Sequence, residues 1–531
     1  MTCKSPFIHD WVFEHAERHP DAPALATPRL RLGYGELAER VRTLAAHLAA
    51  RGVVPGERVV AALPNTPAAV VASLAVQMLG GTVVEVNREW APDVLGAIVA
   101  RVRARHAFVW GRDAERWARV LAGNPLERVW IVTEARERGG EAPRDRVPPA
   151  VSPCVRLGED GRLDVPETDA AGLRLPSLSP DAAALVLFTS GSTGRPRGVV
   201  QTFRNIAANT RSIVEFLALG PEDRAQLVLP LHYCYGRSVL QSHLLAGGSV
   251  FLEPRFAFPR VALEALGAEG CTGFAGVPLT FEIIRRHVEV SSVSLPRLRY
   301  LTQAGGAMAP ETIEWVRAAF HPAKLFVMFG QTEATARLSY LPPERAAEKR
   351  GSIGVAIPGV ELRIVDDDGR ELDAGEAGHL VARGDNVTPG YLDEPEETAA
   401  ILRGGWLWTG DLAMRDTEGF FFHRGRSREI LKIGGHRVSP VEIEHVVAEH
   451  PDVAEAAVIG ASDPLMGEVP VAFVVARPER SPTEDALKAF CRVRMPPYRV
   501  PVRFTAVASL PRNAAGKLLR AQLAAGAAAK R

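Results

Sequence analysis

One loop of this chain gathers small, hydroxyl-bearing and basic residues directly after an apolar run. The run ends at Leu187-Phe188, and the loop reads Thr189-Ser190-Gly191-Ser192-Thr193-Gly194-Arg195-Pro196-Arg197-Gly198. Its hydroxyls, backbone N–H groups and two cations could all reach one ligand, a combination suited to a polyphosphate. The Gly-x-x-x-x-Gly-Lys-Ser/Thr spacing of the common P-loop is absent. Taken alone, the segment fits either a phosphate cradle or a solvated turn after a strand.

The composition is that of a globular chain without a charge bias. Among the 531 residues, 63 basic and 62 acidic side chains nearly cancel, which argues against nucleic acid and anionic membranes as partners. Five well-separated cysteines indicate reduced thiols and a cytoplasmic location. We expect no signal segment and no membrane span, because the most apolar stretch, 59–79, contains two prolines.

Apolar periodicity predicts alternating strands and helices in the first third of the chain. Helical spacing covers 34–51 and 68–79, where Gly80-Gly81 ends the second helix. Short buried strands are expected at 59–63, 82–86, 107–110 and 129–132. This alternation indicates a parallel sheet covered by helices. Residues 134–180, rich in Pro, Arg, Glu and Gly, are interpreted as a long surface connection.

The character of the sequence changes twice in its second half. The α/β pattern resumes at 183 and runs to about 327, and 352–422 carries short strands with turn signals, which predicts a β-rich subdomain. The remaining residues have the helix and strand content of a small α+β domain. We therefore expect an α/β protein with a large domain at 1–424, a hinge at 425–428 and a small mobile domain at 429–531.

Four further segments carry groups that a bound nucleotide would need. They are Gly305-Gly306-Ala307, Gly330-Gln331-Thr332-Glu333, Thr409-Gly410-Asp411 and Pro511-Arg512-Asn513-Ala514-Ala515-Gly516-Lys517. With the loop at 189–198, their order resembles the superfamily of adenylate-forming enzymes, which includes acyl- and aryl-CoA synthetases, adenylation domains of peptide synthetases and luciferases. The resemblance covers essentially the whole chain. It implies a large domain of βαβ-type subdomains joined by a hinge to a small one, with ATP and Mg²⁺ as cofactors.

The resemblance assigns the nucleotide contacts residue by residue. The β- and γ-phosphates would be held by Thr189, Ser190, Gly191, Ser192, Thr193, Gly194 and Arg197. Glu333 would bind Mg²⁺, and Thr332 would contact the α-phosphate. The remaining contacts would come from Gly305, Gly306, Ala307, Phe329, Gly330, Asp411 and Arg426. Structural glycines, a solvated glutamate and a turn-capping aspartate are the alternatives for these residues taken singly.

Two of these assignments depart from the usual family residue. Arg197 stands where lysine is common, but it keeps the charge and offers a fork of donors to phosphate. Phe329 stands where tyrosine is common, so it could still stack on adenine without the hydroxyl. Asp411 would accept from both ribose hydroxyls, and Arg426 would add a second ribose contact.

The small domain would complete the site when it rotates. Residues 425–444 resemble the family's inter-domain segment, with the hinge at Arg428, where tolerance of φ/ψ change matters more than the side chain. Lys432 and Gly435 would then enter the site beside a pantetheine-like arm. Lys517 would be the catalytic lysine, because an ammonium that bridges the carboxylate and the α-phosphate offsets their repulsion. Only seven of the 63 basic residues are lysine, so its presence in this motif is informative.

The acid pocket is expected around Pro230-Leu231-His232-Tyr233-Cys234-Tyr235-Gly236. Amino-acid-activating members usually have aspartate where this chain has Tyr233, so an α-amino acid is not the expected substrate. Tyr233 could close the pocket as an aromatic lid, with Tyr235 and Gly276 as further lining residues, and simple packing is the alternative. Arg237 would favour a second acidic group on the substrate if it faces the pocket, and would cap a carbonyl if it faces outward.

These assignments predict a two-step ligase. A carboxylic acid and ATP would give acyl-AMP and pyrophosphate, after which a thiol would take the acyl group. Coenzyme A is the expected acceptor, and a phosphopantetheinyl carrier protein or a non-thiol acceptor is the alternative. A non-catalytic nucleotide-binding homologue is a further alternative, but it predicts loss of Lys517, Glu333 or Asp411, and all three are present.

Overall fold

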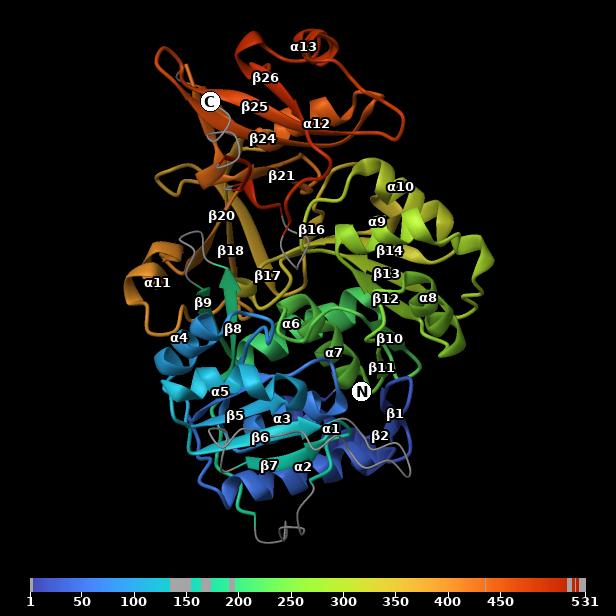
Figure 1. The fold of residues 1–531 in the computed structure, drawn as a ribbon, viewed down its shortest axis with the longest axis vertical. Helices are drawn as coiled ribbons and strands as arrows, with labels where there is room; N and C mark the ends of the chain where they lie inside the picture. The colour runs from blue at the N-terminus through green and yellow to red at the C-terminus, as the bar shows by residue number, and fades with distance from the viewer. Residues whose placement is uncertain are drawn as a thin grey trace.

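A computed structural model describes residues 3–133, 154–163, 173–190, 196–434, 436–512, 518–520 and 522–524. In this part of the chain the strands form four sheets. Figure 1 shows them from the blue N-terminal region at the bottom to the orange and red C-terminal region at the top. The mixed α/β architecture is the one expected from the sequence.

The first sheet has seven strands in the order β7-β6-β5-β3-β4-β8-β9, all parallel to their neighbours except β9. Its strands are β3 (Arg58–Ala62), β4 (Thr82–Glu85), β5 (His106–Trp110), β6 (Arg128–Thr133), β7 (Cys154–Gly158), β8 (Ala183–Ser190) and β9 (Pro196–Thr202). Its region contains α2 (Tyr34–Ala49), α3 (Pro67–Met78), α4 (Pro92–Val102), η1 (Gly111–Asp113) and α5 (Ala114–Ala122). The predicted strands and helices of this region are confirmed. Residues 134–180 are more than a connection, because β7 within them pairs with β6 and extends the sheet.

The second sheet has nine strands in the order β16-β15-β14-β13-β12-β10-β11-β1-β2. They are β1 (Pro23–Ala26), β2 (Arg31–Gly33), β10 (Arg224–Leu227), β11 (Ser249–Leu252), β12 (Gly273–Gly276), β13 (Tyr300–Gln303), β14 (Lys324–Phe329), β15 (Ser339–Leu341) and β16 (Val355–Ala356). Its helices are α1 (Ile8–Arg18), α6 (Phe203–Leu217), α7 (Cys234–Ala246), α8 (Pro259–Ala268), α9 (Pro278–His287) and α10 (Pro310–Ala319), with short turns at η4 (Val290–Ser292), η5 (Thr332–Ala334) and η6 (Pro343–Arg345). In the order given, the six adjacent strands β14-β13-β12-β10-β11-β1 are parallel, so their carboxyl ends share one edge.

Two smaller sheets follow. The third contains β17 (Val360–Val365), β18 (Ala377–Gly384), β19 (Leu402–Arg403), β20 (Trp406–Arg415) and β21 (Phe421–Arg426), with α11 (Pro395–Ile401). The fourth contains β22 (Leu431–Ile433), β23 (His436–Val438), β24 (Val453–Asp463), β25 (Gly467–Ala476) and β26 (Arg503–Ala506), with α12 (Pro440–Ala448) and α13 (Glu484–Arg492). The turns η7 (Ser427–Glu429) and η8 (Pro497–Arg499) complete this region. The expected β-rich subdomain and the small α+β domain correspond to these two sheets.

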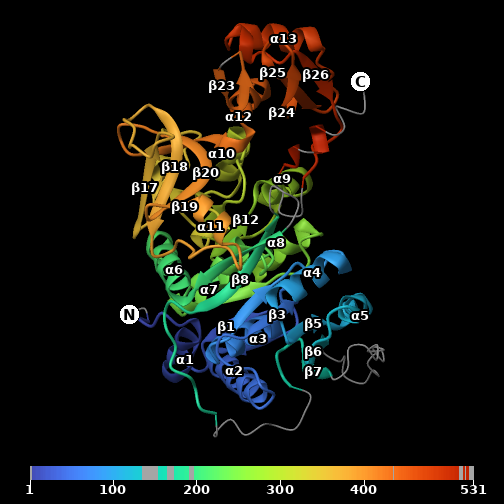
Figure 2. The same cartoon turned by 90° about the vertical axis from the view of Figure 1, so that its left-hand side faces the viewer.

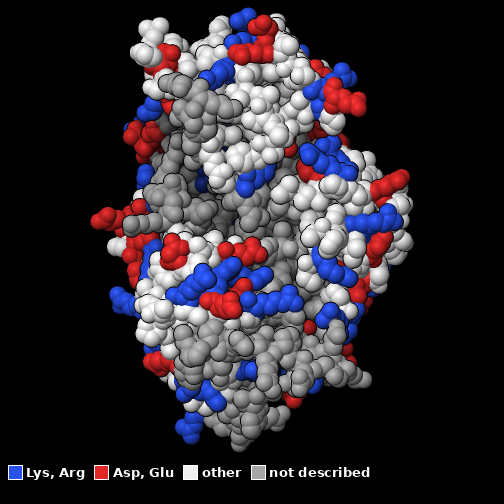
Figure 3. Space-filling model, viewed as in Figure 1, with Lys and Arg blue, Asp and Glu red and all other residues white. Residues whose placement is uncertain are grey.

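The small C-terminal sheet contacts the body of the protein through ion pairs. Arg477 lies 2.9 Å from Glu311 of α10, and Arg286 of α9 lies 3.6 Å from Glu455 of β24. Figure 2 shows this region above α9, α10 and the third sheet. Basic and acidic side chains are interspersed on the face in Figure 3, as the balanced composition predicts.

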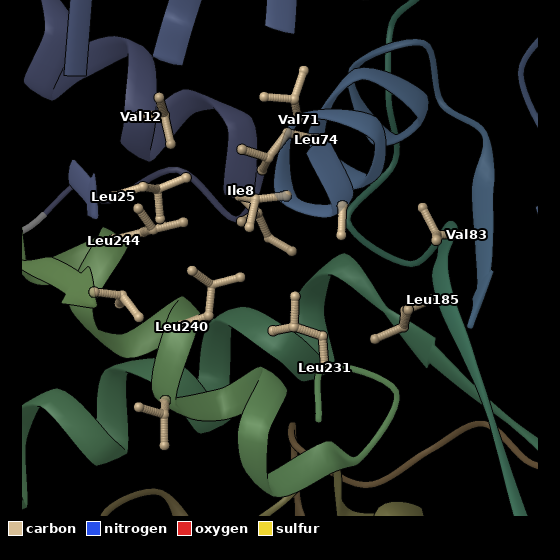
Figure 4. Packing of buried hydrophobic residues seen from close by; sticks show 14 of the residues in the cluster. Ile8, Val12, Leu25, Val71, Leu74, Val83, Leu185, Leu231, Leu240 and Leu244 are labelled. Carbon is tan, nitrogen blue, oxygen red and sulfur yellow. The ribbon is translucent and has the colours of Figure 1, made fainter. Parts of the chain in front are cut away.

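One hydrophobic cluster joins the first two sheets. All twelve residues of α3 are buried, as expected for a helix that is apolar all round. Val71 and Leu74 of this helix pack towards Ile8 of α1 and Leu240 of α7 (Figure 4). Burial between two sheets therefore explains the most apolar stretch of the sequence. Among the described helices none has the length and hydropathy of a membrane span.

Candidate active site

The carboxyl edge of the second sheet brings four of the expected segments together. β10, β12, β13 and β14 are adjacent and parallel in the order β14-β13-β12-β10. The acid-pocket segment follows β10, Gly276 ends β12, Gly305 follows β13, and Gly330 follows β14. Ligands of open α/β sheets bind at this edge. The topology therefore places segments 100 residues apart in sequence around one site.

Two glycines at this edge are required by close contacts. A Cβ at Gly330 would lie 1.9 Å from the carbonyl oxygen of Ala336. Gly305 has a φ of +86°, and a Cβ there would lie 2.5 Å from the hydroxyl of Tyr233. Both positions exclude larger residues, because neither a backbone carbonyl nor a positive φ tolerates a side chain. Their structural role is thus real, and it also shapes the edge of the site.

Glu333 and Thr332 lie where a triphosphate and an acid could meet. The Glu333 carboxylate accepts a hydrogen bond of 2.8 Å from the hydroxyl of Tyr391. The Thr332 hydroxyl contacts the thiol of Cys234 at 3.4 Å, at the start of α7. Burial and the Glu333 charge raise the pKa of Tyr391, so its hydroxyl stays a donor at neutral pH. The motif after β14 is therefore in contact with the acid-pocket segment.

The loop from Thr332 to Arg337 is held in a strained conformation by its neighbours. Thr335 has a φ of +66°, an unusual value for a β-branched residue. The Gln201 amide donates 3.2 Å hydrogen bonds to the carbonyls of Thr332 and Thr335, and Asn386 donates to those of Ala334 and Arg337. Strain of this kind persists only where the surroundings fix it. The loop is therefore preorganised.

Asp411 lies in a compact cluster with the residues expected around the ribose and adenine. Its side chain is 1% exposed, and its Oδ1 lies 2.9 Å from Arg426 Nε and 3.0 Å from His423 Nε2. Its Oδ2 has no hydrogen-bond partner within the described structure. The His423 ring lies 5.8 Å from the ring of Phe329, centroid to centroid. A buried carboxylate oxygen without a donor fits a ligand that brings hydroxyls to it.

The phosphate loop is described only at its two ends. Thr189 and Arg197 face each other across the β8–β9 hairpin. The Arg197 guanidinium lies 2.9 Å from the Glu397 carboxylate and 5.5 Å from the centre of the Tyr391 ring. Since Tyr391 also bonds to Glu333, this ring links the loop to the metal-ligand candidate. The Glu397 side chain is 42% exposed, and a phosphate could replace so weak a partner.

Several expected residues cannot be placed. Gly191, Ser192, Thr193, Gly194, Gly435 and Lys517 lie outside the described residues, as do the side chains of Ser190 and Arg428. Lys432 is described and exposed on β22, where its N–H donates to Glu468 at 2.6 Å. Gly306 and Ala307 are exposed beside Gly305, and the Gly306 carbonyl accepts 2.7 Å from Gln303.

The two pocket tyrosines lie against each other at the start of α7. Their ring centroids are 6.4 Å apart, and the Tyr235 hydroxyl donates a 2.8 Å hydrogen bond to Thr302 of β13. Burial raises the pKa of Tyr235 to about 12, so it remains neutral. The Tyr233 hydroxyl lies beside Gly305, since a Cβ added at Gly305 would lie 2.5 Å from it. Gly276 packs on Thr280 and Phe281 at the end of β12.

Arg237 neither faces the pocket as a free cation nor caps a carbonyl at the surface, contrary to both of our interpretations. Its side chain is buried against Glu85 of β4, with which it forms an ion pair. Its Nη1 donates 3.2 Å to the hydroxyl of Ser73 on α3. The arginine therefore ties α7 to the first sheet. Glu85 lies far away in sequence, so the local pattern gave no sign of this partner.

Three side chains of the site were missed from the sequence. Tyr391 and His423 bond to Glu333 and Asp411, and Arg337 lies buried over the ring of Tyr235, 4.1 Å from its centre. The first two belong to no motif. Arg337 comes only four residues after Glu333, and a cation so close to a phosphate motif was a usable signal.

The structure is a mixed α/β protein in which the segment after β14, expected to bind phosphate, contacts the segment after β10, expected to bind the acid. The family model for AMP-binding enzymes matches residues 12–392, and that for the AMP-binding enzyme C-terminal domain matches 442–517. The chain belongs to the AMP-binding enzyme family.

Named relatives and solved structures match over nearly the full length. The chain is 32% identical to sulfoacetate–CoA ligase of Cupriavidus necator over 512 residues, covering 96% of this chain and 95% of the relative. It is 32% identical to feruloyl-CoA synthase of an Amycolatopsis species, covering 97% and 98%. The structure of o-succinylbenzoate coenzyme A synthetase from Bacillus subtilis with ATP and magnesium is similar, with a TM-score of 0.80, 27% identity and coverage of 97% and 99%.

Proposed function

We infer that this family member is an ATP-dependent acid–CoA ligase that forms an acyl-AMP and then a CoA thioester. The contact between Thr332 and Cys234 carries the assignment, because it joins the phosphate motif to the acid pocket. An acid bound beside Tyr233 would present its carboxylate next to the α-phosphate. Holding two reactants in this way removes much of the entropic cost of their encounter. The named relatives include CoA ligases for several acids, which supports CoA as the acceptor.

We propose that the nucleotide is held by groups that the structure leaves available. The free Oδ2 of Asp411 would accept from a ribose hydroxyl, and Arg426 would hold Oδ1 in place. Phe329 would stack on adenine, and Gly305 would let the base approach the backbone. Arg197 and the loop after Thr189 would bind the leaving pyrophosphate.

A single carboxylate beside phosphates suits Mg²⁺. Within the described residues no cluster of three or more His, Cys, Asp or Glu side chains could form a metal site. Mg²⁺ often binds through one or two carboxylates, several waters and the phosphates of a substrate. Glu333, oriented by Tyr391, meets that requirement. The ion would neutralise charge on the phosphates, while Glu333 orients it and Lys517 approaches the reacting oxygens.

For the second step we propose that residues 429–531 rotate about 425–428. Ser427 of this segment donates a 3.1 Å hydrogen bond to the carbonyl of Gly410 in the present arrangement. Rotation would bring Lys432 and Gly435 to the site.

Since the reaction uses ATP and CoA, and the described cysteines are free thiols, we propose a cytoplasmic location.

Acid-dependent exchange of labelled pyrophosphate into ATP tests the first step directly. Exchange with at least one of a broad panel of carboxylic acids is expected, followed by AMP release and thioester formation when CoA is added. Absence of exchange with every acid, in protein shown to be folded, would contradict the proposal. Thioester formation on a phosphopantetheinyl carrier protein, with none on CoA, would identify the alternative acceptor.

A further inference from the structure

Arg337 is a buried cation without an anionic partner in the described structure. Only 3% of the Arg337 surface is exposed. Its Nε lies 3.2 Å from the thioether sulfur of Met328, and its guanidinium lies over the Tyr235 ring. No carboxylate or carbonyl within the described structure accepts a hydrogen bond from either Nη. Buried charges are normally paired and hydrogen-bonded, so this one has unused binding capacity.

The titratable groups nearest to Arg337 are consistent with the absence of an anionic partner. Burial lowers its pKa, and the neighbouring groups that act in the other direction are Tyr235, Cys234 and Tyr233, which are all neutral at pH 7. No carboxylate is among them. The contrast with Arg237 is direct, because that equally buried arginine is paired with Glu85.

The backbone of Arg337 is fixed. Its carbonyl accepts hydrogen bonds of 2.9 Å from Asn209 and 3.1 Å from Asn386, and its N–H donates 3.3 Å to Asn209. The side chain therefore leaves from a rigid point. A preorganised donor loses little freedom on binding, which favours a role in recognition.

Arg337 lines a small cavity between α6, α7 and the second sheet. Its walls include Val239, Phe274, Ala275 and Met328, and its volume is about 10 Å³, close to that of one water-sized sphere. Thr302 also lines the cavity. Its hydroxyl accepts a hydrogen bond from Tyr235, and no described group accepts a hydrogen bond from the Thr302 hydroxyl. The cavity thus offers a guanidinium and a hydroxyl donor among apolar and neutral polar walls, the latter including Ser238, Ser242, His243 and Tyr300, with no carboxylate.

We propose that Arg337 binds a second anionic group of the acid substrate, a carboxylate or sulfonate at the end opposite the reacting carboxylate. This inference rests on the proposed function and names its substrate class. The reacting carboxylate would lie near Thr332, which contacts Cys234, and the second anion would lie near Tyr235, the next residue but one to Tyr233. Because Cys234 and Tyr235 are adjacent in sequence, these two positions are close and the acid is short. The cavity itself holds about one water-sized group, so the anion would meet the guanidinium from the side of Tyr235 and would not fill the cavity.

Matched acid pairs of equal length test the proposal by pyrophosphate exchange. The pairs are malonate with propanoate, succinate with butanoate, glutarate with pentanoate, and 3-sulfopropanoate with butanoate. For the best-fitting length we expect the wild type to favour the dianion by roughly 10- to 100-fold in kcat/KM, the range of one charge-assisted hydrogen-bonded pair. Arg337→Gln should remove this preference, mainly through KM, and Arg337→Lys should restore part of it.

A double variant, Arg237→Gln with Glu85→Gln, is the matched control. It neutralises the other buried arginine together with its partner and should leave the dianion preference unchanged. Circular dichroism and the thermal unfolding midpoint report whether each variant folds.

Three results decide the proposal. Equal or better use of the monoanionic partner by the wild type would overturn it, even if Arg337→Gln did not fold. An unchanged preference in folded Arg337→Gln would also overturn it, with the proposed function intact. No exchange with any acid would contradict the proposed function itself, and this inference with it.

Discussion

The proposed nucleotide end and the proposed acid end of the site are built differently. At the nucleotide end, polar groups hold one another: Tyr391 bonds to Glu333, and Arg426 and His423 bond to Asp411. At the acid end, the buried guanidinium of Arg337 contacts a thioether and an aromatic ring. The first arrangement positions groups for a ligand that is always the same. The second leaves a charge to be matched by a ligand that differs between relatives.

This difference predicts how substitutions will act. A residue at the nucleotide end should change the rate by the same factor for every acid, because each acid meets the same ATP. A residue at the acid end should change the ratio between acids. Ratios of kcat/KM measure such differences in transition-state binding directly.

The largest effect is expected at the nucleotide end from Lys517→Ala. Loss of an ammonium that bridges two anions should lower exchange by roughly 10³-fold or more, by the same factor for dianionic and monoanionic acids. Thioester formation from supplied acyl-AMP should remain. Lys488→Ala, which removes a surface pair with Glu484, is the control and should have no effect. Loss of both half-reactions would mean that Lys517 acts elsewhere.

The next prediction separates a structural role of Arg237 from a role in acid recognition. Glu85→Gln leaves Arg237 buried and unpaired, which should cost about 3–5 kcal/mol of unfolding free energy. A urea unfolding curve measures this loss, and Glu484→Gln, in an exposed pair, should cost about 0–1 kcal/mol. The preference between succinate and butanoate should not change. A shifted preference would show that Arg237 takes part in acid recognition after all.

The sequence was sufficient for much of the fold, and it also predicted which segments the structure brings together around the proposed nucleotide site. Apolar periodicity located β3, β4, β5 and β6 of the first sheet within a residue or two, because burial between helices demands continuous apolar runs. Thr332 and Glu333 are neighbours in sequence, and Asp411 and Arg426 face each other across one pair of adjacent strands. Residues that a single loop or a single pair of adjacent strands brings together can be predicted from a short stretch of sequence.

The acid end could not be assembled in the same way. Arg237 was one candidate for a pocket cation, since it follows the pocket segment directly, but it pairs with Glu85 of the first sheet. Arg337 reaches the pocket from the loop after β14 and meets Tyr235 only in the folded chain. The strand β7 was missed for a similar reason, because its pairing with β6 depends on a long-range contact. Partners set by tertiary packing leave no periodic signal.

A smaller, uniform effect is expected from Tyr391→Phe. The variant removes the 2.8 Å hydrogen bond to Glu333 and keeps the ring that lies beside Arg197. One hydrogen bond to a charged group is worth about 1.5–3 kcal/mol, so kcat/KM for adenylation should fall roughly 10- to 100-fold for every acid, with a raised Mg²⁺ requirement. Tyr340→Phe, on β15, is the control. A loss confined to dianionic acids would contradict the division between the two ends.

The smallest expected change is that of the acid preference with pH. Burial and the charge of Arg88 lower the pKa of His232 to about 4, and burial lowers that of His243 as well, so neither imidazole at the pocket carries charge near neutrality. A preference based on a protonated histidine would be present below its pKa and lost as the pH rises through it. One based on Arg337 should stay constant between about pH 6 and 8, because an arginine bound to an anion remains protonated. The ratio of kcat/KM for glutarate and pentanoate across that range measures this, and a ratio that falls steadily with rising pH would transfer the role from Arg337 to a histidine.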